Sequence, residues 1–429
     1  MRMSRTAVQR PVQRSVNRSV RRRTRTVLVA VTVAGLLAGA ASAVPAQADA
    51  RQTETQQVSV AQGVENVPVP RGHGTLLAAE PLPEAVRLAG AGTSLKLRYT
   101  SADWAGRASV VSGTLAVPSG RAPAGGWPVV SFGHGFGGTA DTCAPSRTGP
   151  SPMERAVQEA LLATGHAVAV SDYAGIGTPG ASSLIDGTSE GRNVVDVVLA
   201  ARQAVTRATP VTRAAQQAAT LSSSWAAVGY SLGGHAALFA GSLADTYAPS
   251  LRLTGTISMA GLTQLRMITG DPGGYTATGA VNPVTPFMID GVAVTHPGAF
   301  RPDRYLTERG RSLVAESRSI CLDAMATRVA GLTNADLYSD GPGLLAGFQR
   351  WYAAEEVPAV RYSRPVTLFH GLEDTIPAAV SQATAGQLAA AGSDVRFIAV
   401  PGADHLTLLP AIAKDVAARV TGLFTGAAG

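Results

Sequence analysis

The feature that most limits how this chain can fold is a serine between glycines, placed where two hydrophobic patterns meet. Residues 229–233 read Gly-Tyr-Ser-Leu-Gly, with the apolar run 225–229 (WAAVG) before them and the alanine-rich segment 232–244 after them. This order predicts a strand, a sharp turn and a helix, with the Ser231 hydroxyl raised at the end of the strand. The flanking glycines would let strand and helix approach closely. An ordinary glycine-rich turn is the alternative interpretation.

Strands and helices are predicted to alternate on both sides of this turn. Short apolar segments predict strands, and apolar residues at helical spacing predict helices. The predicted strands are 110–117, 128–132, 167–171, 225–229, 257–260, 365–369 and 395–400, and the predicted helices are 154–163, 193–208, 232–244, 380–391 and 411–424. This alternation indicates an α/β fold with a mainly parallel sheet and helices on both faces.

The alternation fails over residues 263–362, which hold scattered aromatic side chains. The simplest interpretation is one α/β domain that is split by an inserted, mostly helical cap. The first part of the core would then span residues 95–262 and the second part residues 363–429. Residues 49–94 are expected to form an N-terminal segment that is partly loose.

The first 48 residues have the pattern of an export signal. Residues 1–26 contain nine arginines and no acidic residue, and the apolar run 27–44 follows and ends in small residues. A basic start, an apolar run and an Ala-x-Ala cleavage site are typical of a signal peptide. A permanent transmembrane anchor is the alternative. The arginine cluster 21–23 leaves export through the Sec or the twin-arginine route open.

Removal of this leader changes the charge of the chain. The formal net charge is +7, from 36 basic and 29 acidic residues. Without the nine leader arginines it becomes −2, because 7 minus 9 is −2. The mature protein is therefore not expected to bind nucleic acid.

The chain has two cysteines, Cys143 and Cys321. An exported protein meets an oxidising environment, so one disulfide is expected, and two separate buried thiols are the alternative. No CxxC or HExxH motif occurs. No zinc site is therefore predicted at the cysteines. The serine chemistry considered below needs no metal or organic cofactor, and none is predicted.

A base for Ser231 is sought among the later histidines. A serine hydroxyl is a poor nucleophile at neutral pH, and it needs a base within hydrogen-bond reach and an acid that orients this base. At strand–turn–helix sites of this kind the chain order is serine, acid, histidine. His405 follows the last predicted strand and is the predicted base. His296 lies in the cap and His370 precedes the candidate acid, which makes both weaker candidates.

The predicted acid is Asp374, in the segment 370–377 (HGLEDTIP) after the penultimate strand. It would hold one imidazole tautomer of His405 and stabilise the imidazolium that forms during attack. Glu373 and Asp404 are alternatives. Asp404 is adjacent to His405 in sequence, and neighbouring side chains usually diverge.

Two backbone N–H groups are expected to form an oxyanion hole. The first is that of Leu232, at the start of the helix after the serine, where the helix dipole also favours negative charge. The second would come from residues 133–138 (GHGFGG), which follow an earlier strand and are typical of an oxyanion loop. The Phe136 N–H is the first choice and the Gly135 N–H the second. His134 is interpreted as a structural residue of this loop.

These motifs resemble those of the secretory lipase family of fungi and actinobacteria over residues 97–424. Besides GYSLGG, HGLEDTIP and GADH, the resemblance includes residues 171–177 (SDYAGIG). It implies an α/β-hydrolase core, a helical cap over an acyl pocket and hydrolysis of carboxylic esters, including triacylglycerols. By the same resemblance Ser231, Asp374 and His405 form the catalytic triad.

The resemblance also implies further contacts. Asp172 and Tyr173 would shape the floor of the pocket or a hydrogen-bonded loop. Tyr173 and Tyr230 are candidate substrate-binding residues in the core, and aromatic residues of the cap are candidates for the acyl site. These cap residues are Phe287, Phe348 and Trp351. Packing within the cap is the alternative for each of them.

The expected function is that of a secreted serine hydrolase, a lipase or esterase that works through an acyl-enzyme. The expected partners are a small-molecule or lipid ester and, transiently, a lipid interface. An acyltransferase or a peptidase on the same scaffold is the first alternative, because only the leaving group or acceptor differs. A non-catalytic binding protein with a decayed site is the second, and the intact serine, aspartate and histidine argue against it.

Overall fold

The computed structural model describes residues 72–208, 220–270 and 274–426, which all belong to the compact unit Gly63–Gly429. The predicted export signal, residues 1–48, lies outside the described residues. Within the described residues, no helix has the length and apolar character needed to cross a membrane.

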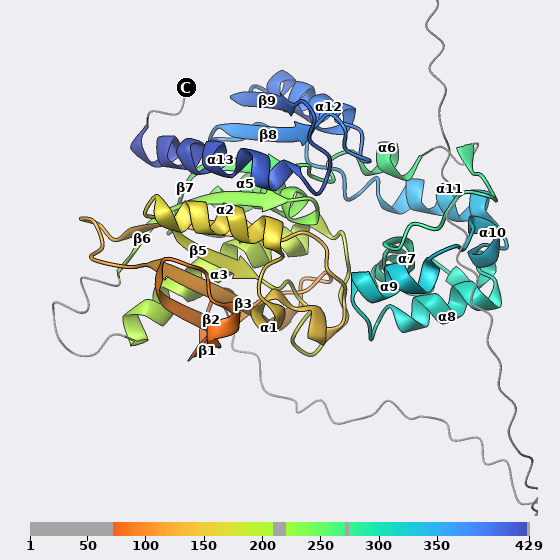
Figure 1. Cartoon of the computed structure of the whole chain (residues 1–429), viewed down its shortest axis with the longest axis horizontal. Coiled ribbons are helices and arrows are strands. Elements are labelled where there is room, and N and C mark those ends of the chain that lie inside the picture. The colour runs from red at the N-terminus through yellow and green to blue at the C-terminus, as the bar shows by residue number, and fades with distance from the viewer. Residues whose placement is uncertain (1–71, 209–219, 271–273, 427–429) are drawn as a thin grey trace, which may run out of the picture. The chain divides into compact units, whose positions relative to one another are not determined.

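The described chain forms one nine-stranded sheet with the order β1-β2-β3-β5-β4-β6-β7-β8-β9 (Figure 1). The strands are β1 (Leu76–Pro81), β2 (Ala91–Ala102), β3 (Ala108–Pro118), β4 (Trp127–Gly133), β5 (Ala167–Ser171), β6 (Leu221–Tyr230), β7 (Arg252–Met259), β8 (Val366–Gly371) and β9 (Val395–Val400). Pairing is antiparallel from β1 to β5 across β2 and β3, and parallel from β5 to β9. The sheet is therefore mainly parallel, as predicted.

Helices cover both faces of the sheet. On one face α2 (Pro152–Ala163) and α13 (Leu408–Thr425) lie side by side, in front of the sheet in Figure 1. On the other face lie α3 (Gly187–Ala208), α5 (Leu232–Tyr247) and α12 (Ala379–Ala390). Neighbouring strand residues point to opposite faces, and both faces are covered, so the central strands are mostly apolar.

Every predicted strand and helix of the core is present, and β5 and β9 have the predicted bounds. Two strands were not predicted. β1 and the first residues of β2 lie in the segment 49–94 that was expected to be partly loose. The sequence of β2 (AGTSLKLRYTSA) alternates between polar and apolar residues, and β1 is a short edge strand. The alternation in β2 is a strand signal that the prediction overlooked, whereas a short edge strand such as β1 gives a weak signal.

Between β7 and β8 the described chain forms helices, turns and isolated bridges. The helices are α6 (Leu265–Thr269), α7 (Thr285–Thr295), η4 (Pro302–Arg304), α8 (Glu308–Glu316), α9 (Leu322–Val329), α10 (Asn334–Leu337) and α11 (Gly341–Trp351). The helices α7 to α11 lie together at the right of Figure 1. We call residues 263–362 the cap. The expected disulfide between Cys143 and Cys321 is present and joins the core to the start of α9.

Candidate active site

Ser231 lies between β6 and α5 in a backbone conformation that L-residues seldom adopt, with φ 53° and ψ −118°. The surrounding chain holds it there. Its N–H donates to the carbonyl of Met259 (2.9 Å), and its own carbonyl accepts from the N–H groups of Gly234 (3.0 Å) and His235 (3.2 Å). A strained residue that is fixed this firmly is typical of functional sites, and here it supports the predicted strand–turn–helix elbow.

Three glycines let the elbow close. A Cβ atom on Gly229 would collide with the carbonyl of Gly233, and one on Gly233 would collide with the carbonyl of Gly133. The backbones of β4, β6 and α5 therefore meet at a distance that only glycine permits. This is the physical reason for the glycine spacing around the serine.

The structure brings Ser231, His405 and Asp374 into one hydrogen-bonded chain. Nε2 of His405 lies 3.0 Å from Oγ of Ser231, and Nδ1 of His405 lies 2.8 Å from Oδ2 of Asp374. The Asp374 side chain is fully buried and that of His405 is 22% exposed. A neutral imidazole that donates from Nδ1 to the carboxylate leaves Nε2 free to accept the serine proton.

The alternative acids lie elsewhere. Glu373 is exposed. The Asp404 carboxylate accepts from the N–H of Leu406 (3.0 Å), the N–H of Thr407 (2.8 Å) and the hydroxyl of Thr407 (2.7 Å). These hydrogen bonds, first that of the Thr407 hydroxyl, lower the pKa of Asp404. Asp404 thus caps the turn before α13, and Asp374 is the acid that contacts His405.

His370, considered above only as a weaker candidate base, supports the loop that carries Asp374. Burial lowers the pKa of His370. Its neutral ring accepts from the Ser381 hydroxyl (2.8 Å) and donates to the carbonyl of Ile376 (2.8 Å). The N–H of Ile376 in turn donates to Oδ1 of Asp374 (2.8 Å). In the sequence, only the short separation between His370 and Asp374 pointed to a link between them. The supporting role of His370 depends on its contacts with Ser381 and Ile376, which only the fold shows.

Tyr230, a predicted substrate-binding residue, supports the loop that carries His405. Its hydroxyl donates to the carbonyl of His405 (2.6 Å), and the two rings lie 5.0 Å apart. Tyr230 is 5% exposed. The Tyr230 hydroxyl is therefore already hydrogen-bonded within the protein.

The predicted oxyanion donors differ in whether they already have an acceptor. The N–H of Gly135 donates to Oε1 of Glu154 at 2.7 Å. No described residue accepts the N–H of Phe136. Leu232 is the first residue of α5, and its N–H has no intrahelical acceptor. Of the two choices in the loop 133–138, the structure favours Phe136. Sequence reasoning did not identify Glu154.

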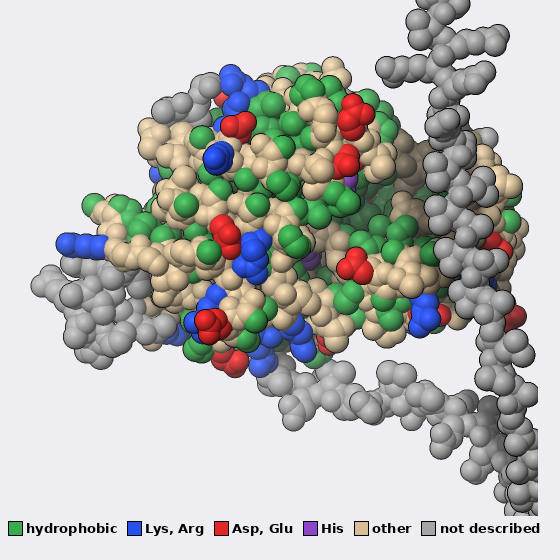
Figure 2. Space-filling view, in the orientation of Figure 1, with side chains coloured by type: hydrophobic (Ala, Val, Ile, Leu, Met, Phe, Trp, Pro, Cys, Tyr) green, Lys and Arg blue, Asp and Glu red, His purple; other side chains and the backbone are tan. Residues whose placement is uncertain are grey.

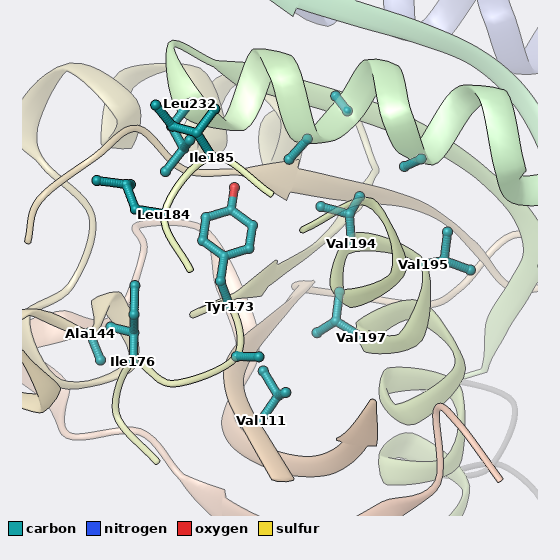
Figure 3. Close-up of a cluster of buried hydrophobic side chains, with 14 of the residues drawn as sticks. Val111, Ala144, Tyr173, Ile176, Leu184, Ile185, Val194, Val195, Val197 and Leu232 are labelled. Atoms are coloured by element: carbon teal, nitrogen blue, oxygen red, sulfur yellow. The ribbon is translucent and has the colours of Figure 1, made fainter. Parts of the chain in front are cut away.

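Asp172 and Tyr173 form a buried hydrogen-bonded loop, which was one of the two expectations for them. The Asp172 carboxylate accepts from the Ser112 hydroxyl and the Ser146 N–H. The Tyr173 hydroxyl donates to the carbonyl of His134 (3.2 Å). Figure 3 shows Tyr173 pointing toward the first turn of α5, among apolar side chains.

The cap aromatic residues pack mainly against one another and against the core. Phe287 is fully buried, and its ring meets that of Phe136 edge-on at 5.0 Å. Trp351 meets Phe300 edge-on at 4.6 Å, and Phe348 is buried. This matches the packing alternative given for these residues. Figure 2 shows a hollow between the core and the cap that is lined mostly by hydrophobic side chains.

The cap is tied directly to the loop 133–138. The N–H of Leu322 donates to the carbonyl of Gly137 (2.9 Å). The adjacent Gly138 packs against the disulfide, since a Cβ atom there would lie 2.9 Å from Sγ of Cys143. The proposed oxyanion loop therefore connects the core and the cap.

Among the described residues, no group of three or more His, Cys, Asp or Glu side chains is arranged to hold a metal ion. The arrangement at Ser231 needs none for acyl transfer. A positioned hydroxyl, a base, a buried acid and free N–H donors are the parts that this chemistry uses.

Comparison with known proteins gives a family and a fold. The secretory lipase family model matches residues 144–426. Lipase A of Candida antarctica in its closed state is similar, with a TM-score of 0.65, 21% identity and coverage of 83% of this chain and 84% of that chain. The rice cell wall degrading esterase LipA of Xanthomonas oryzae is also similar, with a TM-score of 0.67, 17% identity and coverage of 82% and 99%. No curated protein matches the sequence significantly.

The family model covers well over half of the chain, and the similar structures share its α/β-hydrolase fold. The match includes the segments that carry Ser231, Asp374 and His405. We conclude that this chain is an ester hydrolase that belongs to the secretory lipase family.

Proposed function

We propose that the chain is an exported lipase or esterase that cleaves carboxylic esters through an acyl-enzyme on Ser231. The observation that carries this proposal is the unbroken hydrogen-bonded chain from Oγ of Ser231 through His405 to the buried carboxylate of Asp374. Residues 1–48 would act as the export signal. Export also suits the disulfide, which oxidising compartments favour.

In the first half of the proposed reaction, Oγ of Ser231 attacks the ester carbonyl carbon while its proton passes to Nε2 of His405. The carbonyl oxygen becomes an oxyanion that accepts hydrogen bonds from the N–H groups of Leu232 and Phe136. The ester C–O bond then breaks, and the imidazolium gives its proton to the departing alcohol. Asp374 remains ionised and stabilises the imidazolium.

In the second half, a water molecule attacks the acyl-enzyme and gives a proton to His405. The same two N–H groups stabilise the second oxyanion. The bond between the acyl carbon and Oγ of Ser231 breaks, and the serine recovers its proton from the imidazolium. The carboxylic acid leaves and the enzyme returns to its initial state.

We propose that the enzyme prefers esters with an apolar acyl group. The cap, residues 263–362, would cover it, and the hydrophobic hollow between core and cap supports this choice (Figure 2). The aromatic cap residues would then act through the shape of the cap core, because most of their surface is already packed.

The test is hydrolysis of p-nitrophenyl esters from acetyl to oleoyl, with peptide p-nitroanilides and an added alcohol acceptor in parallel. We expect ester hydrolysis that is lost in Ser231→Ala, and no anilide cleavage. Anilide cleavage would support a peptidase instead, and acyl transfer to the alcohol in preference to water would support an acyltransferase. Absence of any Ser231-dependent turnover would contradict the proposal.

A further inference from the structure

Glu154 uses both oxygens of its carboxylate, and the two face different parts of the fold. Oε2 accepts from the N–H (3.2 Å) and the hydroxyl (2.6 Å) of Ser151, which forms a capping box at the start of α2. Oε1 accepts the N–H of Gly135 at 2.7 Å. The residue is 6% exposed. A role as a helix cap explains the contacts of Oε2, but it does not explain the contact of Oε1 with Gly135.

The contact to Gly135 fixes the first of two peptide units in the oxyanion loop. This unit joins His134 to Gly135. Its N–H is held by Glu154, and its carbonyl accepts the hydroxyl of Tyr173 at 3.2 Å. Gly135 also lies against the ring of Tyr230, since a Cβ atom there would be 2.9 Å from a ring carbon. This unit therefore has little freedom to rotate.

The second peptide unit joins Gly135 to Phe136. Its carbonyl accepts from Nδ1 of His134 at 2.7 Å. In a planar trans peptide the N–H points away from the carbonyl, so this contact also sets the direction of the Phe136 N–H. That N–H is the one in the loop 133–138 that we propose as an oxyanion donor.

We infer that Glu154 is a positioning residue for the proposed reaction. By holding the Gly135 N–H, it removes that group from the oxyanion hole and fixes the loop so that the Phe136 N–H is the second donor. This inference rests on the proposed function. A donor that is already in place requires no reorganisation when negative charge develops on the substrate oxygen.

The experiment compares Glu154→Ala, Glu154→Gln and Ser151→Ala by ester hydrolysis, with active enzyme counted by the p-nitrophenol burst. For Glu154→Ala we expect kcat to fall about 10- to 100-fold with KM within about twofold, which is less than the 10²–10³ typical for removal of an oxyanion donor. Glu154→Gln retains one oxygen, which can accept the Gly135 N–H while the NH₂ group takes the place of the acceptor for Ser151, so it should keep kcat within about fivefold and lower Tm. Ser151→Ala loses only part of the helix cap and should lower Tm without lowering kcat.

Hydrogen–deuterium exchange of the peptide that contains residues 133–138 gives a readout that does not depend on catalysis. We expect faster exchange in Glu154→Ala than in Ser151→Ala. Unchanged exchange, an unchanged kcat in Glu154→Ala, or an equal loss of kcat in Ser151→Ala would each overturn the inference. If the wild-type chain lacks Ser231-dependent turnover, the proposed function fails, and the exchange data still test whether Glu154 holds the loop.

Discussion

The nucleophile half of the site and the oxyanion loop 133–138 are held in different ways. In the described structure, every hydrogen bond to Ser231, His405 and Asp374 comes from the core. The oxyanion loop is bonded to the core through Glu154 and to the cap through Leu322. The part that we propose to form the covalent bond is thus hydrogen-bonded within the core alone, whereas the loop that carries the proposed Phe136 donor also depends on the cap.

This difference separates two ways to lose activity. A change at the nucleophile half removes a chemical group and leaves the cap unaffected. A change at a cap residue that contacts the loop leaves the triad intact but alters the loop that carries the Phe136 N–H. The loop has further cap contacts nearby, because the Thr139 hydroxyl donates to the carbonyl of Ser317 (3.1 Å) and Phe136 packs on Phe287. Cap variants that remove one of these contacts to the loop should therefore affect kcat through charge stabilisation.

The largest effect is expected in the nucleophile half, for Asp374→Asn. The amide would favour the wrong tautomer of His405 and would not stabilise the imidazolium, so kcat should fall about 10⁴-fold. Steady-state hydrolysis of a p-nitrophenyl ester measures this loss. Glu373→Gln is the matched control, since Glu373 is exposed and adjacent in sequence. A comparable loss in both variants would remove Asp374 from its proposed role.

A smaller effect is expected in the oxyanion half when the disulfide is replaced in Cys143→Ala/Cys321→Ala. The loop would lose part of its link to the cap, so kcat should fall by up to about 10²-fold, the lower end of the effect of losing a donor. The free energy of unfolding should fall by about 2–4 kcal/mol. Hydrolysis and denaturant unfolding measure the two effects.

The control for the disulfide variant is Arg328→Ala, which breaks an exposed ion pair with Glu316 elsewhere in the cap. Such pairs contribute at most about 1 kcal/mol, and kcat should not change. If the disulfide variant unfolds more easily but keeps its full kcat, the cap does not position the oxyanion loop.

The smallest effect concerns a second link between cap and core, at Glu355. Its carboxylate accepts the N–H of Gly187 at 2.9 Å, and burial raises its pKa from 4.5 to about 7. Asp186 and Glu190 raise this pKa as well, whereas His235 lowers it. Between pH 4.5 and about 7, the Glu355 carboxyl group loses its proton in the unfolded chain but keeps it in the folded chain. The free energy of unfolding should therefore fall as the pH rises from 4.5 to about 7, by at most about 3 kcal/mol.

Glu355→Gln removes this titration. Its Tm relative to the wild type should be higher at pH 8 than at pH 5. At a fixed pH kcat should change little, because the only hydrogen bond of the Glu355 carboxylate among the described residues is to Gly187 and not to the triad or the loop 133–138. Thermal unfolding of both proteins at the two pH values measures the difference. A Tm difference that does not vary with pH would contradict the assignment.

The sequence predicted the parts of the molecule whose signals are local. The central strands are mostly apolar segments, and the turn at Ser231 carries its glycines within five residues. The order of Asp374 and His405 after the last strands follows from the sheet topology that the alternation implies. These features were predictable because each depends on a short segment or on strand order.

The remaining features depend on contacts between segments far apart in the chain. Ser151 and Glu154 have the spacing of a capping box, so the sequence gives Glu154 a complete role at the helix start and no sign of its second contact with Gly135. The aromatic residues of the cap have no periodicity that separates packed rings from exposed ones. Phe287 and Trp351 pack mostly against other protein side chains, and this depends on their neighbours in the fold, which the residue type alone does not reveal.

The most direct test of the account is labelling of the purified chain with a fluorophosphonate, followed by mass spectrometry of the labelled peptide. We predict one label on Ser231, strongly slowed labelling in His405→Ala, and none in Ser231→Ala. Labelling on another residue, or unchanged labelling when His405 is removed, would contradict the claim that Ser231, His405 and Asp374 act as one nucleophilic unit.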